Sequence, residues 1–87
     1  MENEEILESA DAEEINRSIA SVMRNIRKRR GLTQAMISEM SGVSVGSVKR
    51  FEKTGNISLT SFSKLALALG LKQELTELFR EARFRVP

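Results

Sequence analysis

The sequence predicts an all-α domain built from five short helices, without a β-sheet. Apolar residues recur at intervals of three and four along most of the chain, which is the spacing of one face of an α-helix. Glycines separate these stretches at intervals that suit short helices, and the single proline is the last residue. A chain of 87 residues has room for one modest core, so we expect the helices to form one domain.

The first predicted helix begins after Asp11 and ends before Gly31. Asp11 and Glu14 have the spacing of a capping box, in which the two side chains accept hydrogen bonds from each other's backbone N–H groups. The basic cluster at residues 27–30 suits the negative end of the helix dipole. One face of this helix is expected to be apolar, and it consists of Ile15, Ile19, Val22, Met23 and Ile26.

Two short helices follow, joined by a tight turn at Gly42. Thr33 is expected to cap the first, which runs to about Met40. Ser44 is expected to cap the second, which ends near residues 53–55. The residues expected to face the core from this region are Met36, Ile37, Met40, Val43, Val48 and Phe51. A short helix, a tight turn and a second helix with apolar inward positions form the pattern of a helix-turn-helix unit.

Two further helices complete the predicted domain. Ser58 is expected to cap the fourth helix, and Gly70 ends it. The expected apolar faces are Leu59, Phe62, Leu65, Ala66 and Leu69 in the fourth helix and Leu71, Leu75, Leu78, Phe79 and Ala82 in the fifth. We expect a domain over residues 12–83, preceded by an acidic arm at 1–11 and followed by a short tail at 84–87.

The composition excludes several classes of function. The chain has no cysteine and no histidine, so it lacks thiolate and imidazole ligands, a Ser-His or Cys-His nucleophile pair and any disulfide. It also has no glycine-rich phosphate loop, so we expect no enzyme, no bound metal and no cofactor. No apolar run approaches the ~20 residues that span a bilayer, and the first residues are acidic. We therefore expect a cytoplasmic protein with no membrane contact.

Charge is distributed unevenly along the chain. Residues 1–14 hold seven of the twelve acids and no base, whereas residues 15–87 hold all fourteen bases against five acids, a net charge of +9. Such a basic body suits nucleic acid or another polyanion, although a solvated basic surface explains the charge equally well. The acidic arm either only solvates the chain, or docks on a partner or on the basic surface, where it competes with DNA.

Four motifs in order give the chain a family resemblance. They are L-T-Q at residues 32–34, S-G-V-S at 41–44, F-E at 51–52 and L-x-x-F-x-K-L-A-x-A-L-G-L at 59–71. Together they resemble the Xre family of helix-turn-helix regulators, which includes the DNA-binding domain of phage lambda repressor. The stretch at 51–71 more narrowly resembles the HipB-like antitoxins, which accompany HipA-type kinase toxins.

The resemblance assigns DNA contacts to individual residues of this chain. It implies base contacts from Ser44, Val45, Gly46 and Arg50, and contacts to the phosphate backbone from Thr33, Gln34, Lys49, Lys53, Thr54, Asn56 and Ser58. Arg50 is the best candidate reader, because a guanidinium bonds guanine O6 and N7 together. Arg27, Arg29 and Arg30 either add to the phosphate contacts or only complement the helix dipole. Glu52 is expected to orient Arg50 or Lys49, or to cap local structure.

The resemblance implies a homodimeric, sequence-specific repressor that binds a palindromic operator in double-stranded DNA and represses its own transcription unit. The narrower resemblance implies the antitoxin of a toxin–antitoxin module whose partner is a HipA-like kinase toxin. A stand-alone or phage-type repressor without a toxin partner is the first alternative. A protein-interaction module with weak DNA binding is the second, because Val45 and Gly46 offer few groups for reading bases.

Overall fold

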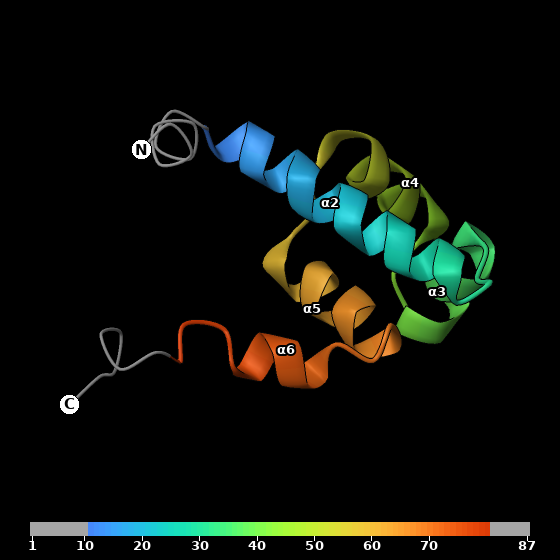
Figure 1. The fold of residues 1–87 in the computed structure, drawn as a ribbon. Helices are drawn as coiled ribbons and strands as arrows, with labels where there is room; N and C mark the ends of the chain where they lie inside the picture. The colour runs from blue at the N-terminus through green and yellow to red at the C-terminus, as the bar shows by residue number, and fades with distance from the viewer. Residues whose placement is uncertain (1–10, 81–87) are drawn as a thin grey trace.

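A computed structural model describes residues 11–80 of the chain. Within this range there are five helices and no strand, as the sequence predicts (Figure 1). The helices are α2 (Ala12–Arg29), α3 (Gln34–Ser41), α4 (Val45–Thr54), α5 (Leu59–Ala68) and α6 (Lys72–Thr76). Nearly all of the expected acidic arm and the whole of the expected tail lie outside the described residues. The proposed domain limits therefore stay a prediction.

The long helix α2 begins at the predicted capping box. The Asp11 carboxylate accepts the N–H of Glu14 at 2.8 Å, and the Glu14 carboxylate accepts the N–H of Asp11 at 3.2 Å. The helix ends in a basic turn, and Gly31 follows with a φ of 70°, in the left-handed region that favours glycine. Both ends of α2 are therefore encoded locally. The helix packs mainly against α4, which lies across it (Figure 1).

The turn between α3 and α4 also forms as predicted. The Thr33 hydroxyl accepts the N–H of Met36 at 3.0 Å and caps α3. Gly42 ends α3 with a φ of 78°, so the chain reverses without strain. The Ser44 hydroxyl accepts the N–H of Ser47 at 3.2 Å and caps α4. These local hydrogen bonds fix where α4 begins.

The core lies where α2, α3, α4 and α5 meet. Its buried apolar residues are Ala20, Met23, Ile37, Val43, Val48, Phe51, Leu65, Ala66 and Leu69. Ile37 of α3 and Val48 of α4 are the largest fully buried side chains, so they hold the two helices across the turn. The ring of Phe51 meets that of Phe62 edge to face, with centroids 6.1 Å apart, and joins α4 to α5.

Some residues expected in the core are exposed. Met36 is 46% exposed and Met40 is 55% exposed, because Ile37 fills the inward stripe of the eight-residue α3. Leu59, the first residue of α5, is 79% exposed. The apolar face of α2 is only half used, since Ile15, Ile19 and Val22 face solvent while Met23 is buried.

The last helix is shorter than predicted. Helix α6 ends at Thr76, and the chain turns over the next residues, where Phe79 takes a φ of 65°. Leu71 and Leu75 pack against the core, whereas Leu78 is exposed and Ala82 lies outside the described residues. Beyond Leu75 too little apolar surface is buried to hold a helix, which is marginal at this length without tertiary contacts.

Candidate nucleic-acid interface

The outward face of α4 carries the residues predicted to meet DNA bases. Val48 and Phe51 turn into the core, whereas Val45, Gly46 and Arg50 are exposed. Ser44 is exposed at the cap of the same helix, where its hydroxyl donates to the Ser47 hydroxyl at 2.9 Å. The four residues predicted to contact bases, at the cap of α4 and along the helix, are therefore all exposed to solvent.

Gly46 has no neighbour that requires a glycine. A Cβ built at this position meets no atom within 4 Å, so a side chain here would extend into solvent. A glycine inside a helix costs about 1 kcal/mol relative to alanine. Its effect on the surface is to leave the backbone of the first turn of α4 open to close approach by a ligand.

A polar groove of about 360 Å³ runs along one flank of α4, where α5 begins. Its lining residues are Ser47, Arg50, Asn56, Ile57, Ser58 and Ser61. The groove therefore unites the predicted base reader, Arg50, with two predicted phosphate contacts, Asn56 and Ser58. The sequence analysis assigned no DNA contact to Ser47 or Ser61. Each lies three residues after a capping serine and therefore on the first turn of its helix.

The loop between α4 and α5 is held by its own hydrogen bonds. The Thr54 hydroxyl donates to the carbonyl of Arg50 at 2.7 Å and accepts the N–H of Asn56 at 3.1 Å, so this residue shapes the loop. Gly55 has a φ of 83°, and a Cβ there would lie 2.7 Å from the carbonyl carbon of Asn16 in α2. The loop is thus packed tightly onto α2, and Ser58 starts α5 by accepting the N–H of Ser61.

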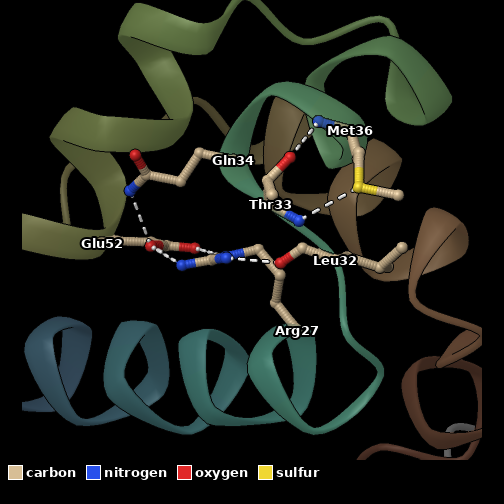
Figure 2. A network of polar contacts seen from close by, with 6 residues as sticks. All are labelled: Arg27, Leu32, Thr33, Gln34, Met36 and Glu52. Atoms are coloured by element: carbon tan, nitrogen blue, oxygen red, sulfur yellow. Dashed lines mark hydrogen bonds and ion pairs between the residues drawn. The ribbon is translucent and has the colours of Figure 1, made fainter.

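Behind this face lies a network of polar side chains (Figure 2). Arg27 of α2 donates from Nε to Oε2 of Glu52 at 2.7 Å and from Nη2 to Oε1 at 2.9 Å, which is a bidentate ion pair with α4. Arg27 Nη1 donates to the carbonyl of Leu32 at 2.6 Å, and Gln34 Nε2 donates to Glu52 Oε1 at 2.9 Å. The Glu52 carboxylate on α4 is therefore hydrogen-bonded to α2 through Arg27 and to the first residue of α3 through Gln34.

This network corrects two sequence-based expectations. Glu52 was expected to orient Arg50 or Lys49, or to cap local structure; its hydrogen-bond partners are Arg27 and Gln34, so the expected role toward Arg50 or Lys49 is wrong. Arg27 was considered for a phosphate contact, but it is only 7% exposed and its guanidinium is occupied within the fold. Burial alone would raise the pKa of Glu52, but hydrogen bonds from Arg27 and Gln34, together with nearby positive charge, bring the pKa below its ordinary value.

Gln34 links this network to the outer surface. Figure 2 shows its amide nitrogen facing Glu52 while its amide oxygen points away. An amide nitrogen has two hydrogens, so one remains for a phosphate oxygen after the bond to Glu52 is made. Gln34 is also the first residue of α3, where the positive end of the helix dipole lies. Its predicted phosphate contact is compatible with its position, as is that of the exposed Thr33 beside it.

The family of this chain follows from comparison with known protein families. A helix-turn-helix family model, of the Xre or lambda-repressor-like kind, matches residues 23–73, which is more than half of the chain. The chain belongs to this helix-turn-helix family. The family is a DNA-binding regulatory domain and is not an enzyme family. Comparison with curated proteins gives no significant match.

In this helix-turn-helix protein α4 is the second helix of the motif, the one that enters the major groove in such domains. The exposed Lys49 and Lys53 lie one turn apart on the other flank of α4 from Arg50. They line a second groove, of about 300 Å³, together with Arg24, Gln34 and Glu52. Arg24 was missed by the sequence analysis, although its position one turn before Arg27 on α2 was a signal that could have found it.

Two further classes of site were sought in the described part of the chain. Within residues 11–80, no three or more carboxylates gather in a way that could hold a metal ion. None of the helices in that range combines the length and the apolar character needed to cross a bilayer.

Proposed function

We propose that this DNA-binding transcription regulator is a repressor that recognises a palindromic operator as a homodimer and controls its own transcription unit in the cytoplasm. The observation that carries the proposal is the outward face of α4, where Arg50 stands beside the exposed first turn of the helix. The bidentate pair of Arg27 and Glu52 holds that helix from behind. A rigid helix with an exposed arginine is suited to reading a base edge.

The chemistry of the reading face limits what one copy can distinguish. Arg50 can bond one guanine, which is worth roughly 1–3 kcal/mol of discrimination. Val45 can contact a thymine methyl group, and Gly46 offers only its backbone. One copy therefore reads few base pairs. Two copies on a two-fold site double this discrimination, which favours a dimer that spans half-sites about 34 Å apart.

Unused apolar surface also supports a second protein chain as a partner. A groove of about 470 Å³ between α2, α5 and α6 has an almost wholly apolar lining. The residues that line it are Ser18, Ile19, Val22, Met23, Ile26, Phe62, Ala66, Leu71, Glu74, Leu75 and Leu78. The same surface favours the second candidate function, a protein-interaction module in which DNA binding is weak.

The narrower proposal is a HipB-like antitoxin whose partner is a HipA-like kinase toxin. Its support is the resemblance of residues 51–71, from the F-E pair in the last turns of α4 to the K-L-A-L-A-L-G-L run that begins in α5. A kinase encoded beside this chain, and a stable complex of the two purified proteins in gel filtration, are the expected results. A chain that represses its promoter but binds no such kinase is instead the stand-alone or phage-type repressor.

Fluorescence anisotropy on the promoter fragment and on a scrambled duplex, across a salt series, tests the proposed function. A repressor binds the promoter fragment more tightly, and log Kd rises linearly with log salt because counterions are released from the phosphates. Equal or absent binding to the two duplexes would leave the protein-interaction module as the better account. Sedimentation of the free protein and of the complex gives the number of copies on the DNA.

A further inference from the structure

A small, mostly apolar groove lies between the start of α2 and the loop that joins α4 to α5. Its volume is about 230 Å³, and its lining residues are Asn16, Ile19, Phe51, Gly55, Ile57, Leu59 and Phe62. Ile19 and Leu59 are large apolar side chains that are exposed there, so apolar surface is left uncovered within residues 11–80. The groove adjoins the larger apolar groove between α2, α5 and α6, with which it shares Ile19 and Phe62.

The small groove also borders the predicted DNA interface. Ile57 lines both this groove and the polar groove that contains the predicted phosphate contacts of the α4–α5 loop. Two cations, Arg17 of α2 and Lys53 of α4, each lie within two residues of a residue that lines the small groove. Both are exposed, and within the described residues neither forms an ion pair or a hydrogen bond. The surface therefore combines an apolar hollow with positive charge.

The acidic arm (residues 1–11) has the complementary chemistry. Ile6 and Leu7 are adjacent apolar residues, and glutamates at positions 2, 4, 5 and 8 lie on either side of them. Apolar side chains suit the groove, and carboxylates suit the cations beside it. The sequence left two roles open for the arm, solvation of the chain or docking, and this complementarity favours docking.

The arm joins α2 close to the groove. Asn16, which lines the groove, lies about 7.5 Å along the helix from Asp11, at 1.5 Å per residue. The four residues from Asp11 back to Leu7 span at most about 14 Å. Leu7 can therefore reach the groove of its own chain. A segment tethered by so few residues acts at an effective concentration on the order of millimolar, so a weak contact is enough to hold it.

We propose that the acidic arm docks in this groove of its own chain through Ile6 and Leu7, and that the docked arm competes with DNA for the loop between α4 and α5. Docking brings the glutamates to the side of Arg17 and Lys53, where they take the place of a DNA phosphate. The inference rests on the proposed function, because the arm competes only with a ligand that the loop binds. Binding of DNA displaces the arm, so the affinity of the full chain includes the cost of that displacement.

Carbodiimide cross-linking of the full chain without DNA tests the docking. The reagent joins a carboxylate to a lysine amine in contact with it, and mass spectrometry locates the amide. We expect a link within one chain from the arm to Lys53, and none to Lys72, which lies near the far end of α2. Leu59→Ser removes apolar surface from the groove at an exposed residue, and is expected to lower the yield of the link by about threefold or more. Leu67→Ser is the matched control, because Leu67 is an exposed leucine of α5 that does not line the groove.

Fluorescence anisotropy on the promoter fragment and on the scrambled duplex tests the competition. The double variant Ile6→Ser with Leu7→Ser keeps every charge of the arm, so a gain in its affinity cannot come from a change in net charge. The apparent Kd is the intrinsic Kd divided by the fraction of chains that are free to bind, so an arm docked about two-thirds of the time raises Kd about threefold. We expect the double variant to bind both duplexes more tightly by about this factor or more.

Any of three results would overturn the inference. They are an absent link to Lys53, a link that Leu59→Ser leaves unchanged, and equal DNA affinities for the wild-type chain and the double variant. Links found only between two chains would overturn it as well, and would assign the groove to a second copy. A wild-type chain that binds neither duplex would refute the proposed function and with it the competition, whereas the link within one chain would still show where the arm lies.

Discussion

The ion pair between Arg27 and Glu52 predicts a strong and measurable coupling in stability. Each side chain of the pair is only 8% exposed, and Glu52 accepts three hydrogen bonds at 2.7, 2.9 and 2.9 Å. In Glu52→Leu the guanidinium of Arg27 stays buried with only the carbonyl of Leu32 as its partner. Breaking a buried pair in this way costs about 3–5 kcal/mol. Arg27→Met leaves the carboxylate with Gln34 alone and is expected to cost about as much.

The double variant Arg27→Met with Glu52→Leu distinguishes the pair from two independent residues. Neither charge is then left buried, so the double variant is expected to lose much less than the sum of the single losses. Glu39→Gln is the control, because Glu39 is exposed on α3 and its change is expected to cost less than about 0.5 kcal/mol.

Urea unfolding followed by circular dichroism measures these differences. With a slope of about 1 kcal/mol per molar urea for a domain of this size, a single loss of about 3 kcal/mol lowers the midpoint by about 3 M. Single losses below about 1 kcal/mol, or a double variant whose loss equals their sum, would show that this pair does not hold α2 to α4.

Three more predictions follow from named contacts. The pKa of Glu52 is lower in the folded state than in the unfolded state, so the unfolded chain binds its proton more readily. The stabilisation from the ionised carboxylate is therefore present above the unfolded-state pKa of this glutamate and is lost as the pH falls through its folded-state pKa, and urea titrations of Glu52→Gln should show no such loss. Gly46→Ala is expected to raise stability by about 1 kcal/mol, because its Cβ meets nothing, yet to weaken DNA binding; stronger binding in anisotropy would argue against close backbone approach. Gly55→Ala is expected to lower stability by more than about 1 kcal/mol, because its Cβ would lie 2.7 Å from backbone of α2, and an unchanged thermal midpoint would contradict that packing.

Helix starts and turns were predictable because their causes are local. Asp11, Thr33, Ser44 and Ser58 each cap the helix that the sequence assigns to them, and each accepts an N–H three residues ahead. Such a hydrogen bond depends only on neighbouring residues, so it can be read from spacing alone. Gly42 ends α3 for the same kind of reason.

Burial and long-range pairing could not be predicted with the same success. Periodicity marked Met36 and Leu59 as core residues, but which apolar residue is covered depends on how the helices pack, and both are exposed. Arg27 and Glu52 are 25 residues apart in the sequence. The sequence alone explains Arg27 by the helix dipole and Glu52 by local capping, so it does not indicate that the two side chains pair. The three-helix groove at Arg24 was missed for the same reason, because it exists only once α2 lies beside α4.

Arg50 on α4 is proposed to read a base, and the affinities of three proteins for two duplexes test this role. Kd is measured for wild type, Arg50→Ala and Lys53→Ala on the promoter fragment and on the scrambled duplex, at one salt concentration. Arg50→Ala is expected to lower the preference for the promoter fragment by about tenfold or more, whereas Lys53→Ala is expected to weaken binding to both duplexes equally. Equal losses on the two duplexes for Arg50→Ala would contradict it.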